Sequence, residues 1–218
     1  MQVSLVDKMG SDLTVVNAAR VSFAKESEWD TITPSGKTPG LLQDKDERLI
    51  KYLATHEHWS PFAHCTLQFR IKAPVFVARQ LVKHQVGLAW NEVSRRYVDD
   101  DPEFFIPDNW RLKAEDKKQG SSNEAIEFDV SELIGHACDT YDRMLEANIA
   151  PEMARMVLPQ NMMTEWYWSG TLYAFARVCN LRCADDTQAE TRVVADLIDE
   201  LTEREFPTSW KYLRNDKK

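Results

Sequence analysis

The chain has 218 residues, of which 43% are hydrophobic and 28% charged, a composition that suits one globular domain and excludes collagen-like and disordered chains. Its net charge of −8, from 27 basic and 35 acidic residues, argues against a general nucleic-acid-binding surface, so we expect no nucleic-acid partner. No apolar run approaches the ~18 residues that span a bilayer, and the N-terminus lacks a signal-peptide pattern. A cytoplasmic protein without a membrane partner is therefore expected.

Periodic patterns predict both helices and strands. An alternating segment at 3–10 predicts a strand, and the strict alternation of apolar and polar residues over 65–71 predicts a half-buried strand within 60–74. A turn, a strand and an extended stretch are expected within 91–111. Apolar residues recur at helical spacing in the segments that we predict as helices: 12–25, 45–58, 75–87, 131–147, 151–159, 163–182 and 186–206.

Two polar segments are predicted as loops, one at 26–40 and an exposed one at 113–125. Helices around a small set of strands predict an α+β fold, and residues 1–218 are expected to form a single domain. The cysteines are too few and too irregularly spaced for a disulfide framework, so free thiols are expected at all four: Cys65, Cys138, Cys179 and Cys183.

The densest polar cluster extends over 79–97 and reads RQLVKHQVGLAWNEVSRRY. If residues 75–87 form one helix, Arg79 and Lys83 share a face, because side chains four positions apart are neighbours. Two such cations either hold an anion between them, with phosphate as the natural candidate, or pair with neighbouring acids. The sequence leaves both interpretations open.

A second group consists of arginines on largely apolar helices, Arg155, Arg177 and Arg182. Burial of an unpaired charge is costly, so each needs either an internal acid or an anionic ligand. The sequence does not decide between these partners.

The spacing of His56, His58 and His64 resembles that of metal ligands. However, no carboxylate is placed as in HExxH, and a proline interrupts the segment, so structural or cofactor-contacting imidazoles are favoured over zinc and no metal is expected. The chain also lacks the GxGxxG, GxxxxGK[ST] and GxSxG motifs, which argues against Rossmann dehydrogenases, P-loop NTPases and α/β-hydrolases.

Five ordered segments resemble the flavin-dependent thymidylate synthase family (ThyX) over most of the chain. They are VVNAARVSFAK with Ser22, DERLIKYLATHEHWSPFAH with its HxSPFxH pattern, KAPVFVARQ leading into KHQVGLAWNEVSRRY, ARMVLPQN, and NLRCADDTQAETR. The family signature typically reads RHRxxSxNExSxRY. Here the first triplet is Lys83-His84-Gln85, Leu88 stands at the first serine position, and Arg177 stands where the family has an asparagine.

The resemblance implies a small antiparallel or mixed sheet flanked by long helices, in a homotetramer with active sites at subunit interfaces. It implies a methyltransferase that reductively methylates dUMP to dTMP, with FAD as cofactor, NADPH as its reductant and methylenetetrahydrofolate as the carbon donor. dUMP and folate are then the small-molecule partners. The altered triplet motivates one alternative, a divergent member that binds nucleotide or RNA without synthase activity.

By matching position, the resemblance assigns dUMP contacts to a group from one subunit, a group from another and two arginines: Gln80, Leu81, Val82 and Lys83; Glu92, Val93, Ser94, Arg95 and Arg96; Arg155 and Arg182. FAD contacts are assigned to Ser60, Lys83, His84, Gln85, Glu92, Thr171, Leu172, Tyr173 and Arg177. His58 and Tyr97 are expected near the flavin ring and the folate, and Arg96 at the phosphate. The expected catalytic residues are Ser94, which would orient or polarise dUMP, and Arg182, which would stabilise charge on the pyrimidine oxygens.

Overall fold

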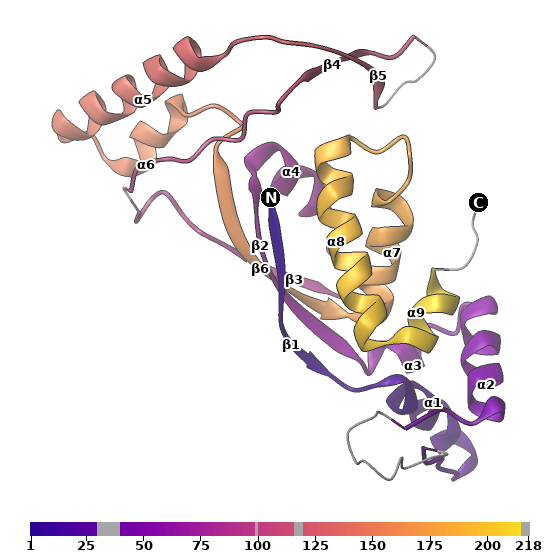
Figure 1. Ribbon diagram of the computed structural model, residues 1–218. Coiled ribbons are helices and arrows are strands. Elements are labelled where there is room, and N and C mark those ends of the chain that lie inside the picture. Colours follow the sequence, from indigo (N-terminus) through magenta and orange to yellow (C-terminus); the bar gives the residue numbers. More distant parts are fainter. Residues whose placement is uncertain (30–39, 99, 116–119, 215–218) are drawn as a thin grey trace.

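The structure, a computed structural model, describes residues 1–29, 40–98, 100–115 and 120–214. At its centre is a four-stranded antiparallel sheet with the strand order β1-β2-β6-β3 (Figure 1). The strands are β1 (Gln2–Met9), β2 (Thr66–Pro74), β3 (Leu88–Glu92) and β6 (Met163–Thr171). The predicted α+β class is confirmed. Most of the loop predicted at 26–40 lies outside the described residues.

β2 forms where the alternating pattern predicts it. Leu67, Phe69 and Ile71 are buried, whereas Arg70 between them is exposed. β2 pairs with β1 on one side and β6 on the other, so the strand lies inside the sheet and its apolar face carries the core.

The prediction of one helix over 163–182 is wrong, because this segment forms β6 followed by α7 (Leu172–Arg182). Every second residue over 164–168 is buried, which is the period of a strand, and β6 pairs with both β2 and β3. Thr171 ends the strand and starts the helix, since its hydroxyl accepts a hydrogen bond from Ala174 N at 3.1 Å.

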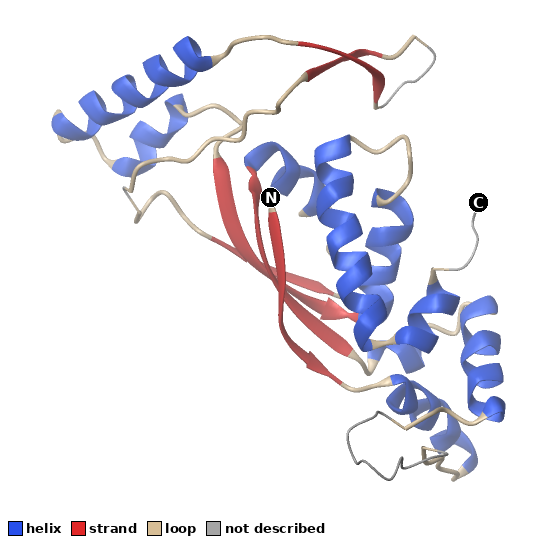
Figure 2. Ribbon diagram, in the orientation of Figure 1, coloured by secondary structure: helices blue, strands red, loops and turns tan. Residues whose placement is uncertain are grey.

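Helices cover one face of the sheet, as Figure 2 shows, with α7 and α8 (Ala189–Glu205) nearest to it. The core between the layers is aromatic: the Phe175 ring lies 5.0 Å from Phe69 and 5.3 Å from Trp168, edge-on to both. α8 confirms the helix predicted over 186–206.

The helix that follows β2 is shorter than predicted. α4 (Val75–Leu81) ends at Leu81, and Gly87, with φ of +78°, leads the chain into β3. The expected helical face shared by Arg79 and Lys83 is therefore wrong, because Lys83 lies in the turn after the helix. Both side chains are exposed, and neither has an acidic partner among the described residues.

Short helices pack together at one end of the sheet (Figure 1). They are α1 (Asp12–Arg20), η1 (Val21–Phe23), α2 (Asp44–Thr55), α3 (Ser60–Ala63) and α9 (Pro207–Leu213). Asp12 joins the two ends of the chain, since its carboxylate accepts hydrogen bonds from Thr208 N at 2.9 Å and Ser209 N at 2.8 Å. The sequence patterns did not predict α9.

The remaining elements form an arm beyond the other end of the sheet (Figure 1). They are β4 (Trp110–Lys113), β5 (Ser121–Ile126), α5 (Ser131–Glu146), α6 (Pro151–Ala154) and η2 (Arg155–Val157). The segment expected to be a loop over 113–125 is largely exposed, but its C-terminal part forms β5, which pairs with β4; residues 116–119 lie outside the described residues.

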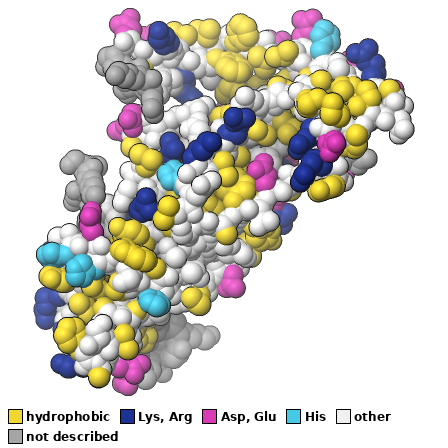
Figure 3. Space-filling view, turned by 180° about the vertical axis from the view of Figure 1, so that it is seen from behind, with side chains coloured by type: hydrophobic (Ala, Val, Ile, Leu, Met, Phe, Trp, Pro, Cys, Tyr) yellow, Lys and Arg dark blue, Asp and Glu magenta, His cyan; other side chains and the backbone are white. Residues whose placement is uncertain are grey.

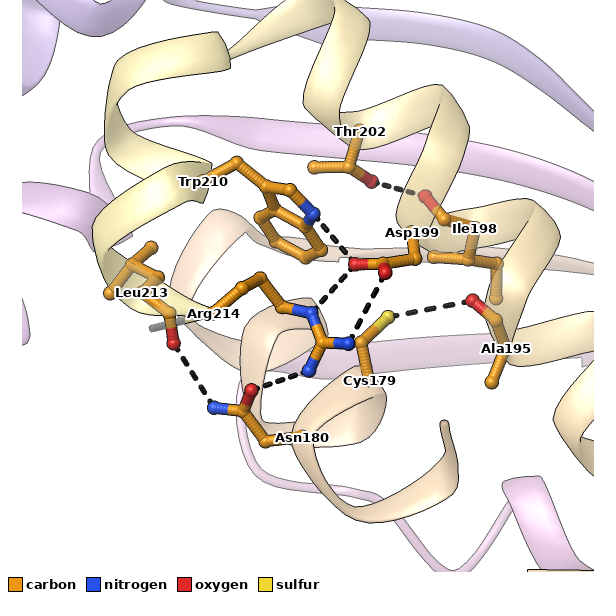
Figure 4. Close-up of polar contacts among 9 residues, drawn as sticks. All are labelled: Cys179, Asn180, Ala195, Ile198, Asp199, Thr202, Trp210, Leu213 and Arg214. Atoms are coloured by element: carbon orange, nitrogen blue, oxygen red, sulfur yellow. Dashed lines mark hydrogen bonds and ion pairs between the residues drawn. The ribbon is translucent and has the colours of Figure 1, made fainter. Parts of the chain in front are cut away.

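A polar network fixes α7, α8 and α9 against one another (Figure 4). Asp199 accepts hydrogen bonds from Trp210 Nε1 at 2.7 Å and Arg214 Nε at 2.6 Å, and Arg214 Nη1 donates to Asn180 at 2.5 Å. The pair of Asp199 and Arg214 thus links three helices and fixes the position of α7.

All four cysteines are free, as predicted. In the described part of the chain, no helix is both long enough and apolar enough to cross a membrane.

Candidate active site

The residues that the resemblance assigns to dUMP lie at the two ends of β3. At the first end are α4 and the turn over 82–87, and at the second end are Glu92 and the segment that follows it. A five-residue strand at about 3.3 Å per residue separates these ends by roughly 13 Å. We describe them as the turn end and the Glu92 end.

At the turn end, His84 and Arg182 form a hydrogen bond that joins the turn to the C-terminus of α7. Arg182 Nε donates to His84 Nε2 at 3.0 Å. Burial, and then the positive charges of Arg182 and Arg177, lower the pKa of His84. A neutral imidazole holds the guanidinium without neutralising it, and the other Arg182 nitrogens have no protein partner among the described residues. The arrangement is suited to an anionic oxygen.

Arg177 and Tyr173 line a cavity of about 510 Å³ between α2, α7 and α9. Lys51 and Tyr212 form part of its wall, and the Lys51 ammonium lies 6.0 Å from the centre of the Tyr212 ring. One carboxylate, Glu57, also lines the cavity, so the two cations leave a net positive charge. That charge and the two aromatic rings suit a ligand that carries both phosphate and a planar ring. The chemistry of this cavity therefore fits FAD, the cofactor that the resemblance implies.

Two of the assigned residues belong to the core instead. The side chains of Leu81 and Leu172 are fully buried among core residues, so neither side chain can touch a ligand. Leu172 also donates its peptide N–H to Cys65 O at 2.8 Å. By contrast, Lys83 and Gln85 are exposed on the turn.

At the Glu92 end, the carboxylate of Glu92 is fixed by two strands. Thr164 Oγ1 on β6 donates to Glu92 Oε1 at 2.8 Å, and Trp90 Nε1 donates to Oε2 at 3.1 Å. The Trp90 ring stacks on Trp166 with centroids 4.4 Å apart, which fixes the donor in turn. Neither Thr164 nor Trp90 was predicted as a site residue, although the alternation of buried residues in this segment is the signal that could have found Thr164.

The segment after β3 presents a hydroxyl and two guanidinium groups. Arg96 Nε donates to Ser94 Oγ at 3.0 Å, and the Arg96 guanidinium lies 5.0 Å from the centre of the Tyr97 ring. Arg95 is held by the carbonyl of Asp100 at 2.5 Å. Ser94 therefore has an arginine beside it but, among the described residues, no histidine or carboxylate that could remove its proton.

A second cavity, of about 490 Å³, opens beside this segment. Its charged lining residues are three cations and five carboxylates: Lys72, Arg95 and Arg155, with Glu92, Asp100, Asp101, Glu103 and Glu165. Arg155 donates to the backbone carbonyl of Glu152 at 3.3 Å, and no described acid pairs with it. No acid forms an ion pair with Arg155 or Arg182 among the described residues, which leaves both charges available to a ligand, whereas Glu57 lines the same cavity as Arg177. On the face shown in Figure 3, Lys and Arg side chains gather across the middle of the molecule.

Ser60 and His58 lie on the segment around α3, outside both ends of β3, whereas Tyr97 belongs to the Glu92 end. Ser60 begins α3 and is exposed, and His58 lies edge-on to Tyr52 with ring centroids 5.8 Å apart. Tyr97 is 79% exposed. A single chain therefore does not bring together all the residues assigned to one nucleotide and one cofactor.

The histidine segment does not form a metal centre. Among the described residues, no three His, Cys, Asp or Glu side chains are grouped so that they could hold a metal ion. His56 Nδ1 instead lies 2.8 Å from Tyr52 O, as expected for a structural imidazole.

Sequence patterns also missed a partly buried series of hydrogen-bonded side chains that includes Gln80. Gln80 contacts Gln188, which contacts Glu190, which is paired with Arg111 of β4. An acid on the buried face of a predicted amphipathic helix was the available signal for Glu190, but nothing in the sequence pointed to Arg111 as its partner.

Comparisons with known proteins agree over the whole fold. The sequence model of the family described as "Thymidylate synthase complementing protein" matches residues 4–208. A flavin-dependent thymidylate synthase of Thermus thermophilus is 37% identical over 212 residues, covering 95% of this chain and 73% of the relative. One from Thermotoga neapolitana is 36% identical over 213 residues, covering 96% and 88%. The solved structure of the UMP/dUMP methylase PolB from Streptomyces cacaoi bound with 5-Br dUMP aligns with a TM-score of 0.79 and 28% identity, covering 97% of this chain and 93% of its own.

Proposed function

The chain belongs to the flavin-dependent thymidylate synthase family, and we propose that it is a methyltransferase that converts dUMP to dTMP. The observations that carry this proposal lie at the Glu92 end, where Ser94 and Arg96 are hydrogen-bonded to each other and Arg155 lines the neighbouring cavity of about 490 Å³. A hydroxyl and two arginines without acidic partners suit a phosphate monoester. We propose Arg96 and Arg155 as the phosphate contacts.

Arg182 is proposed to act on the pyrimidine. Its Nε is engaged by neutral His84, which fixes the guanidinium plane and leaves the remaining donors for an oxygen that gains charge during the reaction. Arginine keeps its positive charge at any ordinary pH, and the lowered pKa of His84 keeps the imidazole neutral, so it accepts the hydrogen bond without adding a second charge.

Two of the four cysteines are unsuited to attack on the ring. Burial, first among several causes, raises the pKa of Cys65 to about 12, and burial also raises the pKa of Cys179 far above its ordinary value. Ser94, held by Arg96 and without an adjacent base, is proposed to orient or polarise dUMP.

FAD, when bound and reduced by NADPH, would supply the hydride, and methylenetetrahydrofolate would supply the carbon. The side chains proposed to hold FAD are those of Ser60, Lys83, His84, Gln85, Glu92, Thr171, Tyr173 and Arg177. Leu172, which was also predicted as a contact, is not among them, because its side chain is buried and its peptide N–H is bonded to Cys65 O. His58 and Tyr97 are proposed near the flavin ring and the folate.

We further propose that the active site is shared between subunits of a homotetramer. The turn end and the Glu92 end of β3 lie apart in one chain, which supports a site in which a second chain contributes one of the two ends around one dUMP. A cytoplasmic location and a single domain over 1–218 remain predictions.

Formation of dTMP tests the function directly. Purified protein supplied with FAD, NADPH, methylenetetrahydrofolate and dUMP should form dTMP, measured by mass spectrometry. Arg96→Ala should lose dUMP binding and keep most FAD binding, whereas Arg204→Ala, an exposed arginine paired with Glu200 on α8, should change neither. Binding of dUMP without any dTMP would favour the divergent nucleotide-binding alternative instead.

Subunit complementation tests the shared site. Arg96→Ala and Arg182→Ala proteins, each inactive alone, should recover about a quarter of wild-type activity when refolded together, because a quarter of randomly mixed shared sites contain both intact arginines. If each site is built from one chain, the mixture stays inactive.

A further inference from the structure

Four side chains form a hydrogen-bonded series that leads from β4 to Gln80. Arg111 Nη2 donates to Glu190 Oε1 at 2.6 Å, and Gln188 Nε2 donates to Glu190 Oε2 at 3.1 Å. Gln80 Nε2 then donates to Gln188 Oε1 at 2.6 Å. These residues come from β4, the start of α8 and α4, so the hydrogen bonds join three segments that are distant in the sequence.

Glu190 sets the direction of the hydrogen bonds in this series. A carboxylate can only accept hydrogen bonds, so Gln188 must turn its NH₂ group toward Glu190 and its oxygen toward Gln80. Gln80 must then turn its own NH₂ group toward that oxygen. The orientation of both amides follows from the charge of Glu190, independently of how either amide is drawn.

The carboxylate is held firmly in its charged form. Glu190 is only 7% exposed. Burial would raise its pKa, but the hydrogen bond and charge of Arg111 outweigh burial, with help from Gln188, and the pKa is lowered. Arg111 is itself fixed by Ser121 of β5, to which its Nε donates at 2.7 Å.

Among the described residues, one atom of this hydrogen-bonded series is left without a partner. Gln80 Oε1 accepts no hydrogen bond from any residue in the described part of the chain, and Gln80 is partly exposed. We propose that Glu190 is a positioning residue that acts through Gln188 to make Gln80 present its oxygen, an acceptor, to the nucleotide. This inference rests on the proposed function, in which Gln80 contacts dUMP.

The inference names the part of dUMP that Gln80 meets. The phosphate of dUMP is mostly a dianion at neutral pH and offers only acceptors. The nucleotide has two hydrogen-bond donors, the pyrimidine N3–H and the ribose 3′-hydroxyl. Gln80 therefore recognises one of these two donors and leaves the phosphate to the arginines.

A double-mutant cycle tests whether Glu190 acts on the ligand through Gln80. Glu190→Gln can offer its own NH₂ to Gln188, which allows both amides to reverse and turns the NH₂ of Gln80 toward the ligand. Equilibrium dUMP binding should weaken by tenfold or more, because two donors then face each other in a partly buried site. In a Gln80→Ala background the same substitution should change dUMP affinity less than twofold. Glu200→Gln, which removes the same charge from an exposed position of α8, should leave binding at the wild-type level.

Two ligands identify the donor. If the ribose hydroxyl is the partner, 2′,3′-dideoxyuridine monophosphate should bind wild type and Glu190→Gln equally; if N3–H is the partner, 3-methyl-dUMP should do so. A merely structural role for Glu190 predicts the same loss in the wild-type and Gln80→Ala backgrounds and with every ligand, and that result would overturn the inference.

Where Glu190→Gln does not fold, Gln188→Met takes its place, and its effect should likewise vanish without Gln80. If wild type binds no dUMP, the proposed function has failed; if it binds dUMP and the cycle shows no coupling, only this inference has failed.

Discussion

Gly170→Ala tests whether the contact between β6 and the start of β3 holds the site together. Gly170 lies opposite Leu88 in the sheet, and a Cβ at this position would stand 2.6 Å from the carbonyl oxygen of Gly87. An ordinary contact begins at 3.4 Å, so the backbone must open by about 0.8 Å. That carbonyl accepts from Thr171 N at 3.1 Å, so the opening also weakens the bond that ties the turn to β6.

We expect Gly170→Ala to cost about 2 kcal/mol of unfolding free energy, typical of overpacking. For a chain of this size the midpoint of thermal unfolding should fall by roughly 4–8 °C. Because β3 carries both ends of the candidate site, kcat/KM should fall tenfold to a hundredfold, as for displacements on the order of 1 Å.

Gly135→Ala is the matched control. Gly135 lies inside α5, and an added Cβ meets nothing within 4 Å, so the substitution should stabilise the protein by about 0.5–1 kcal/mol and leave activity unchanged. Calorimetry and steady-state kinetics on both variants decide the question. If Gly170→Ala melts and turns over like wild type, the packing of β3 against β6 does not determine the geometry of the site.

The remaining predictions concern buried polar groups. Asp12→Ala should destabilise by about 2 kcal/mol in urea unfolding, because two peptide N–H groups of α9 lose their acceptor, and Asp12→Asn should lose less. Arg20→Ala should cost about 3–5 kcal/mol by the same measurement, since it leaves the fully buried carboxylate of Asp46 without its cation; an unchanged stability would contradict this. Burial, Arg182 and Arg177 hold the pKa of His84 below its ordinary 6.5, so the unfolded chain binds the proton more tightly. The free energy of unfolding should therefore fall as pH drops below about 6.5, and His84→Gln should remove that part of the pH dependence.

Elements with one clear period were predictable from the sequence. β2 alternates strictly, and α5 and α8 carry a single apolar stripe, so local pattern and final environment agree. β6 was mistaken for a helix because its aromatic residues fit either period. The strand forms because β2 and β3 both supply hydrogen-bonding partners from distant parts of the sequence, a condition that no local window contains.

The candidate site divides in the same way. Arg155 and Arg182 were recognised because charged side chains on largely apolar helices are visible in the sequence, and Arg95 and Arg96 because they belong to a dense polar cluster that resembles the family signature. The partners that orient them were not, since His84 meets Arg182 only when the turn after α4 packs against the end of α7. A contact between an arginine and a neutral imidazole on separate elements leaves no opposite charge or spacing signal to find in the sequence.

The separation of the two ends of β3 favours assembly as part of the proposed chemistry. Arg182 at the turn end and Arg96 at the Glu92 end serve the same nucleotide in the proposed function, yet β3 keeps them apart in each chain. A rigid strand cannot fold back to bring its own ends together. The same strand can present one end to each of two neighbouring subunits, so a chain with this geometry would contribute to two active sites and complete neither alone. Loss of subunit contacts should then abolish turnover before it unfolds the protein, an order of events that activity and circular dichroism measured on serial dilution would reveal.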